Sequence, residues 1–165
     1  MRAKHADKAT PNAKIAYAVL CAESYALAQK PEADWKPLFE KLWEAPASAP
    51  MNRWGEWADD FIEMVPEFLY AGDAYEDGDF YWLSRDLYDV LVPLEADMPT
   101  KWNDLLAAIQ LAALQYIDGE DDPTGLAEEA YEDIENALLA AHVELPKVDL
   151  AIIDRKNAKS FSRIL

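Results

Sequence analysis

One run of acidic residues has the spacing that metal chemistry on a helix requires. Glu63 follows Asp59 and Asp60 at four and three residues, and Glu56 extends the run by one helical turn. This spacing places carboxylates on one helix face. Hard carboxylate oxygens suit Mg²⁺, the ion used in diphosphate chemistry. The run therefore defines one hypothesis, a Mg²⁺-dependent hydrolase of a nucleotide or a diphosphate that uses Glu56, Asp59, Asp60 and Glu63.

This hypothesis needs a second acidic set that faces the first. All-α enzymes that transfer prenyl groups use a similar aspartate-rich run but need a larger bundle, and all-α pyrophosphohydrolases pair Glu-x-x-Glu with Glu-x-x-Asp motifs. Among 32 acidic residues such spacings arise easily by chance. The second set would come from Asp86 with Asp89, or from Glu129 with Glu132 and Asp133, and neither brings the Lys and Arg that hold a diphosphate. A solvated helix face is the preferred interpretation, and neither a metal ion nor a cofactor is expected.

Other catalytic signatures do not occur in the sequence. There is no Gly-rich phosphate loop, no Cys/His spacing typical of zinc sites and no Gly-x-Ser-x-Gly elbow. The single cysteine, Cys21, lies in an apolar run and allows no intrachain disulfide, so no oxidising compartment is required. No uncharged apolar stretch reaches membrane-spanning length. These features favour a soluble cytoplasmic protein that is not an enzyme.

The negative charge is concentrated in one part of the chain. Residues 42–146 contain 25 acidic and three basic side chains, a net charge of −22, whereas residues 1–41 sum to +2 and residues 147–165 to +3. A field of this sign repels nucleic acid and anionic membranes and attracts basic proteins. The expected partner is therefore a basic protein, with no binding to nucleic acid or membrane.

Aromatic residues are interleaved with these acids in two places, as in interfaces that combine aromatic anchors with a charged rim. Trp54, Trp57 and Phe61 are expected in the core, while the other aromatics could be core or surface. The predicted partner-binding surface combines the two places. Its first part contains Asp73, Tyr75, Glu76, Asp77, Asp79, Tyr81 and Trp82, and its second part contains Glu128, Glu129, Tyr131, Glu132 and Asp133.

The elements that would position these residues are helices. Only five Gly are present, and apolar residues recur every three or four positions, which predicts an all-α, single-domain bundle of about six or seven helices. Residues 1–146 would form the acidic helical domain. Residues 147–165 would form a short, basic and partly irregular C-terminal extension whose conformation the pattern leaves open. The expected helices are Pro11–Gln29, Asp34–Glu44, Met51–Val65, Asp79–Glu95, Thr100–Asp118 and Leu126–His142, with a short turn at 67–71 and a connector at 45–50.

Three segments together resemble the small all-helical immunity proteins of bacterial polymorphic-toxin systems. They are the helix Ala13–Glu23 with the following Leu38–Trp43, the segment Trp54–Trp57, and the central helix that begins at Trp102. The resemblance covers about two thirds of the chain by these segments and their surroundings. It implies a protein that binds and neutralises a toxin. Many such toxins are basic nucleases, which suits an acidic inhibitor.

The sequence therefore supports three hypotheses. The first is a non-enzymatic acidic binding protein of the immunity type. The second is the Mg²⁺-dependent hydrolase. The third is an acidic mimic of nucleic acid, whose carboxylates follow phosphate spacing and occupy the groove of a DNA-binding protein.

Overall fold

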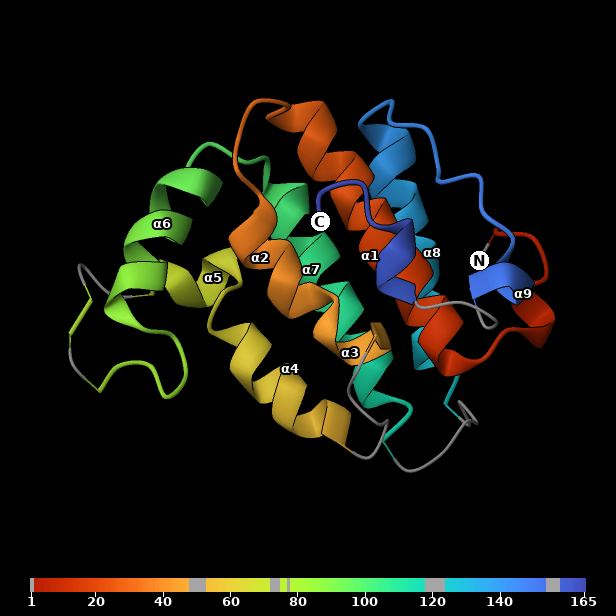
Figure 1. Ribbon diagram of the computed structural model, residues 1–165, viewed down its shortest axis with the longest axis horizontal. Coiled ribbons are helices and arrows are strands. Elements are labelled where there is room, and N and C mark those ends of the chain that lie inside the picture. Colours follow the sequence, from red (N-terminus) through yellow and green to blue (C-terminus); the bar gives the residue numbers. More distant parts are fainter. Residues whose placement is uncertain (1, 48–52, 72–74, 77, 118–123, 154–157) are drawn as a thin grey trace.

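The computed structural model describes residues 2–47, 53–71, 75–76, 78–117, 124–153 and 158–165, and over these residues it is all-α, as predicted. Its α-helices run from one end of the chain to the other (Figure 1). Short 3-10 turns at Ala6–Lys8 and Ala158–Phe161 lie near the two ends of the chain. The helices are α1 (Pro11–Gln29), α2 (Lys36–Leu42), α3 (Glu44–Ala47), α4 (Trp54–Ile62), α5 (Pro66–Leu69), α6 (Arg85–Glu95), α7 (Thr100–Leu114), α8 (Leu126–Ala140) and α9 (Leu150–Ile153).

Helix α1 has the bounds that the sequence predicts, for the predicted reason. The Thr10 hydroxyl accepts a hydrogen bond from the backbone N–H of Ala13 at 3.3 Å, and Pro11 occupies the first helical position. Such a cap satisfies one of the backbone N–H groups that a helix start leaves without a partner. Every residue from Ile15 to Ala26 is buried. Helix α1 is therefore enclosed on all sides.

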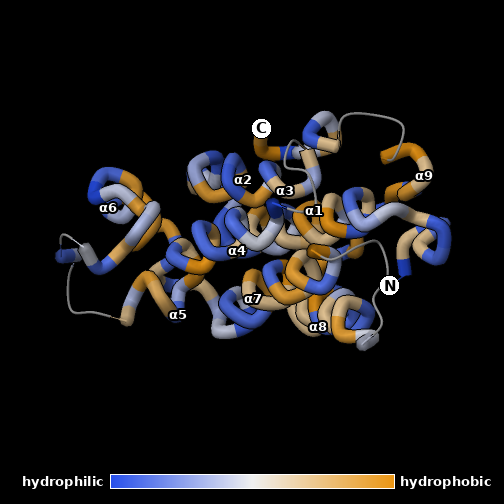
Figure 2. The backbone as a smooth tube through the Cα atoms, turned by 90° about the horizontal axis from the view of Figure 1, so that it is seen from below, coloured by the Kyte–Doolittle hydropathy of each residue, from blue (hydrophilic) through white to orange (hydrophobic). Residues whose placement is uncertain are grey.

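Helices α7 and α8 pack along each other and along α1, and α4 packs on the other side of α7. The sequence predicts α7 as the central helix, and α7 does contact three others, but Leu111 on it is exposed. Helix α1 is more completely enclosed because α9 and the turn at Ala158–Phe161 cover the face that the long helices leave open. Figure 2 shows these C-terminal segments lying over α1 on the side opposite α8.

Five of the six tryptophans form the centre of the core, with Trp82 the exception. The expectation that Trp54, Trp57 and Phe61 are core residues is confirmed, since none is more than 3 % exposed. Each buried indole N–H donates a hydrogen bond, which removes the cost of burying it unpaired. The acceptors are backbone carbonyl groups for Trp35, Trp54 and Trp57 and carboxylates for Trp43 and Trp102.

Buried glutamates tie both chain ends to this core. Glu23 accepts hydrogen bonds from the Trp43 indole at 2.7 Å, from the Arg163 backbone N–H at 2.8 Å and from the Ser162 hydroxyl. Glu135 accepts one from the Tyr17 hydroxyl at 3.0 Å and one from the Arg2 backbone N–H. Glu135 is buried, although Glu132 and Asp133 on the same helix are exposed, because the N-terminal segment covers it.

The C-terminal extension, whose conformation the sequence leaves open, packs on the bundle where it is described. It forms α9 and pairs with the N-terminal segment through a bridge of Lys4 with Asp149. His5 lies 2.7 Å from the same Asp149 carboxylate, and these partners lower the pKa of Asp149.

Several predicted helices are two to four residues shorter at an end than expected, and two predicted boundaries differ in a way that matters for the site. Helix α3 occupies the first part of the predicted connector, and the rest of that connector, 48–50, lies outside the described residues. Helix α6 begins at Arg85, six residues after the predicted start, because the Ser84 hydroxyl caps it by accepting from the Leu87 N–H. None of the described helices combines the length and the apolar character needed to cross a bilayer.

Candidate functional site

Exposed aromatic side chains gather at one end of the molecule, around α5, α6 and the segment that leads into α6. The side chain of Tyr81 is 98 % exposed and that of Trp82 is 36 % exposed, and Phe68 and Tyr70 of the α5 region are also exposed. In the described part of the chain, all other aromatic side chains are at least partly buried. We call this end, formed by α4, α5, α6 and residues 78–84, the aromatic end.

Glu63, directly after α4, holds the segment that carries the exposed rings. Its carboxylate accepts hydrogen bonds from three consecutive backbone N–H groups, those of Tyr81 at 2.6 Å, Trp82 at 2.8 Å and Leu83 at 2.7 Å. Hydrogen bonds to a charged acceptor are shorter and stronger than neutral ones. The backbone of this segment is therefore fixed although the Tyr81 side chain projects into solvent.

A cluster of three rings fixes the same segment from the other side. Tyr75 stacks on Phe80 with centroids 5.4 Å apart, and both rings contact Tyr88 of α6 at 5.3 and 5.6 Å. The Tyr75 hydroxyl donates to the Leu83 carbonyl at 3.1 Å. Tyr75, which the sequence assigns to the partner surface, is thus largely a structural residue, and Tyr81 is the ring that is presented.

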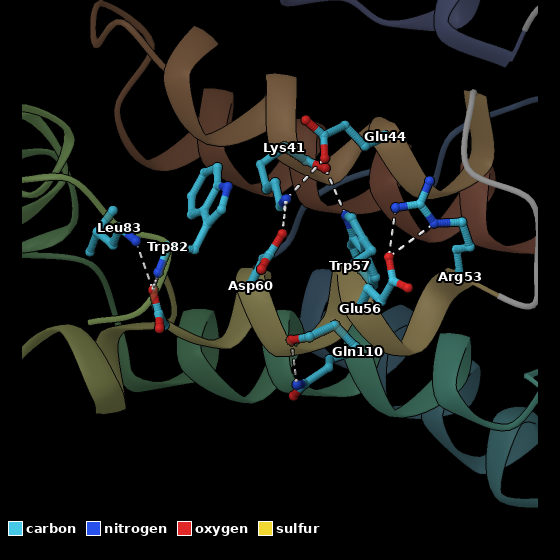
Figure 3. Close-up of polar contacts among 11 residues, drawn as sticks. Lys41, Glu44, Arg53, Glu56, Trp57, Asp60, Trp82, Leu83 and Gln110 are labelled. Carbon is cyan, nitrogen blue, oxygen red and sulfur yellow. Dashed lines mark hydrogen bonds and ion pairs between the residues drawn. The ribbon is translucent and has the colours of Figure 1, made fainter. Parts of the chain in front are cut away.

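A lysine lies between acids and an aromatic ring beside Glu63. The Lys41 side chain is 5 % exposed, and its Nζ lies 2.9 Å from an Asp60 oxygen and 3.0 Å from a Glu44 oxygen. The same Nζ lies 4.2 Å from the centroid of the Trp82 ring. Figure 3 shows the lysine pointing from α2 toward Asp60, with the Trp82 ring beside it. This Lys41 cage gives the buried charge the partners that burial demands.

Three of the four carboxylates of the metal hypothesis are engaged elsewhere. Glu56 pairs with Arg53 at 2.7 Å and Asp60 with Lys41 at 2.9 Å (Figure 3). Glu63 accepts from the three backbone N–H groups, and Asp59 is exposed. Among the described residues no three His, Cys, Asp or Glu side chains converge in a way that could hold a metal ion. The spacing that suggested Mg²⁺ is used for ion pairs and for loop anchoring.

The second part of the predicted partner surface lies away from the first. The acids Glu128, Glu129, Glu132 and Asp133 are exposed on α8, as expected, but Tyr131 is 1 % exposed and belongs to the core. Helix α8 packs on α7 and α1, whereas α6 packs on α2 and α5. Figures 1 and 2 agree in placing α6 at one end of the long axis and α8 beyond the middle. The two parts do not form one continuous patch.

Of the four acids in the first part of the predicted surface, the structure describes two. Glu76 and Asp79 are exposed at the aromatic end, where the Glu76 N–H donates to an Asp79 oxygen at 3.0 Å. Asp73 and Asp77 lie outside the described residues.

Sequence reasoning missed two exposed rings and the residues that hold the segment. Phe68 lies in the helix Pro66–Leu69 and Tyr70 directly follows it, and this helix is only one turn long and cannot bury a ring on every side. That shortness was the available signal. Glu63 and Lys41 carry no sequence signal for their roles, because their partners lie 18–20 and 19 residues away along the chain.

Between α4, α5 and α6 the aromatic end contains a pocket of about 490 Å³. Acidic side chains and aromatic rings both line it, and its principal lining residues are Asp59, Glu63, Phe68, Asp79, Phe80 and Tyr88.

Comparison of the chain with protein-family models, with curated proteins and with solved structures finds no match. The functional argument therefore rests on the aromatic end itself.

Proposed function

We propose that this chain is a non-enzymatic acidic binding protein, an inhibitor of the immunity type that neutralises a basic toxin through its aromatic end. The observation that supports the proposal best is Tyr81, a nearly fully exposed ring on a backbone fixed by Glu63. A stable fold has no need of a large exposed ring on a rigid support. Tyrosines of this kind are typical binding hot spots.

Rigidity matters because association removes conformational freedom. A surface segment that is ordered only on binding reduces the net affinity by the cost of ordering it. At the aromatic end, three hydrogen bonds to Glu63 and the Tyr75, Phe80 and Tyr88 rings order the segment before any partner arrives. Preorganisation of this kind favours tight binding and slow dissociation.

Charge complementarity supports a basic partner. Residues 54–95 contain 12 acidic side chains and one basic side chain, Arg85. Two of these acids pair with Lys41 and Arg53, which lie outside this range, and ten remain. A field of this sign raises the association rate of a basic protein, toward about 10⁸ M⁻¹s⁻¹ at low salt. That the partner is a toxin comes from the resemblance of Ala13–Glu23 and the Trp102 helix to immunity proteins, many of which neutralise basic nucleases.

A cytoplasmic location belongs to the same proposal. The single cysteine, Cys21, is buried in α1, and one cysteine cannot form an intrachain disulfide, so the fold does not depend on an oxidising compartment.

The first test is capture of the partner followed by a matched pair of truncations. A lysate of the source organism would be passed over the immobilised protein, washed at low and then high salt, and the retained basic protein identified by mass spectrometry. Its dissociation constant would then be measured for Tyr81→Ala and for Leu139→Ala, an exposed apolar residue on α8.

We expect Tyr81→Ala to weaken binding by about 2 kcal/mol, roughly thirtyfold, as for a hot-spot ring. Its melting temperature should stay unchanged because the side chain packs on little. Leu139→Ala should leave the affinity unchanged. Equal affinities for wild type and Tyr81→Ala would show that the aromatic end is not the binding surface.

A further inference from the structure

Glu63 connects the pocket at the aromatic end with the Lys41 cage, because it lines the pocket and also accepts from the backbone N–H of Trp82, whose ring lies beside Lys41. The cage consists of two carboxylates and one ring around a cation that the chain supplies itself. The pocket combines the same kinds of group, the carboxylates of Asp59 and Asp79 with the rings of Phe80 and Tyr88. None of its described lining residues is Lys or Arg. The chain thus fills one acidic aromatic site and leaves the other without a cation.

The pocket carboxylates differ in how far they are already engaged. Glu63 accepts from three backbone N–H groups and contributes mainly its charge. One Asp79 oxygen accepts from the Glu76 N–H, which leaves the other oxygen available. Asp59 makes no hydrogen bond or ion pair with the described part of the chain. Two carboxylates can therefore accept hydrogen bonds from a cationic ligand.

Three aromatic rings line the same space. Phe80 and Tyr88 are inclined at 46° with centroids 5.6 Å apart, and Phe68 contributes a third ring that is partly exposed. Ring faces attract cations, and they attract weakly hydrated planar cations most readily because little water must be removed. The combination of ring faces with carboxylates selects a guanidinium group over a compact, strongly hydrated ammonium group.

We propose that this pocket binds the guanidinium group of an arginine side chain of the basic partner. The inference rests on the proposed function, and it names the group that the acidic surface recognises. Asp59 and Asp79 accept the guanidinium N–H groups, and the rings of Phe80 and Tyr88 stack on or beside its plane. A volume of about 490 Å³ lies within the range of pockets that enclose small organic groups, so the side chain enters without displacing the walls.

The test uses the full chain with an isolated probe, so that no partner is needed. N-acetylarginine amide would be titrated while ¹³C-methyl and ring NMR signals of Ile62, Phe80 and Tyr88 are followed. N-acetylcitrulline amide, which has nearly the same shape and no charge, is the matched probe. N-acetyllysine amide is the third arm and tests guanidinium against ammonium.

We expect saturable shifts with the arginine probe, weaker shifts with the lysine probe and none with the citrulline probe. Asp59→Asn should weaken binding of the arginine probe by about fivefold, which is roughly 1 kcal/mol for a partly desolvated ion pair. Asp59 is exposed, so this variant should fold normally. Glu129→Gln on α8 removes one charge far from the pocket and should leave the titration unchanged.

Equal shifts with arginine and citrulline, or no saturable shift with arginine, would overturn the arginine pocket. Such a result leaves the proposed function standing if Tyr81→Ala still weakens the complex with the captured partner. Conversely, saturable arginine binding together with a partner complex that is indifferent to Tyr81→Ala and to Asp59→Asn would remove the proposed function while keeping the pocket as a guanidinium site.

Discussion

In two regions of this molecule a glutamate carboxylate holds an irregular segment of the chain, with different results. In the core around α1, Glu23 holds the C-terminal segment by accepting from the Arg163 N–H and the Ser162 hydroxyl. At the aromatic end, Glu63 holds the segment before α6 by accepting from three backbone N–H groups. In both, a carboxylate replaces the hydrogen bonds that irregular backbone cannot make with itself.

The two regions differ in what the held segment does with its side chains. The chain ends held by Glu23 and Glu135 cover the core and complete the burial of α1. The segment held by Glu63 leaves Tyr81 in solvent. The same local chemistry therefore closes a core in one region and presents a surface in the other. The comparison shows that order of the backbone and exposure of the side chain are separate properties, and the proposal of a binding surface at the aromatic end rests on their combination.

The largest effect should come from breaking the core anchor. Glu23→Ala would leave the Trp43 indole N–H buried without its acceptor and would release the Arg163 N–H. We expect a loss of about 3 kcal/mol in the free energy of unfolding, measured by urea denaturation. Glu32→Ala, which removes an exposed acid near the end of the same helix, should change stability by less than about 0.5 kcal/mol.

In folded Glu23→Ala the affinity of the aromatic end for its partner should be unchanged, because the two anchors act separately. A stability loss equal to that of Glu32→Ala would show that the carboxylate does not anchor the C-terminal segment.

The second effect concerns Glu95, at the end of α6 where the aromatic end meets the core. Its side chain is buried, one oxygen accepts from the Trp102 indole at 3.3 Å, and the other has no hydrogen-bond partner in the described structure. Burial raises the pKa of Glu95 from its ordinary 4.5 to about 8, against the opposing effects of Trp102 and Lys30. The folded state therefore keeps a proton that the unfolded state has released.

This difference predicts how stability depends on pH. The contribution of Glu95 to stability is fully present below pH 4.5, falls as pH rises from 4.5 to about 8, and is constant above that. Glu95→Gln removes the titration, so its free energy of unfolding relative to that of the wild type should rise with pH between 4.5 and about 8 and stay constant above that. Urea denaturation of both proteins at several pH values, followed by tryptophan fluorescence, measures the difference. Parallel stability curves would contradict the raised pKa.

The smallest effect should be on the rate of association with the partner, and it should differ between the acids of the aromatic end and those of α8. Glu67→Lys with Glu76→Lys reverses two exposed charges at the aromatic end, and Glu129→Lys with Glu132→Lys reverses two on α8. We expect the first pair to slow association with the partner by about three- to tenfold at low salt, with the difference disappearing at high salt. The second pair should slow association less than about twofold, as a distant change in the field.

If both pairs slowed association equally, the acids of α8 would belong to the binding surface, as the sequence predicts. Stopped-flow association at two salt concentrations distinguishes these results.

Much of the fold follows from local pattern. The bounds of α1 follow from Thr10, Pro11 and the apolar repeat, since a helix cap acts within four residues. The start of α6 is predicted six residues too early, because Phe80 and Leu83 continue the helical spacing ahead of the Ser84 cap. Glu63, which lies 18–20 residues earlier in the chain, holds residues 81–83 outside the helix. The hydrophobic repeat shows which face of a helix is apolar. It carries no information on a carboxylate that accepts hydrogen bonds from the backbone of another part of the chain.

The candidate site shows the same division. Tyr131 and Tyr81 both lie among acids in the sequence, yet Tyr131 is buried and Tyr81 is 98 % exposed. Tyr131 faces the core because α8 packs on α7 and α1. Residues 78–84 form no helix, so nothing packs over Tyr81.

The sequence by itself determined the all-α class, the principal helices and the concentration of negative charge between residues 42 and 146, because helix propensity, hydrophobic period and charge are properties of neighbouring residues. Only the tertiary structure decided which acids are solvated, which are buried anchors and which ring is presented. Those outcomes depend on contacts such as Glu63 with the Tyr81 N–H and Glu23 with the Arg163 N–H. The partners in such contacts are separated by 18 and 140 residues, and packing alone brings them together.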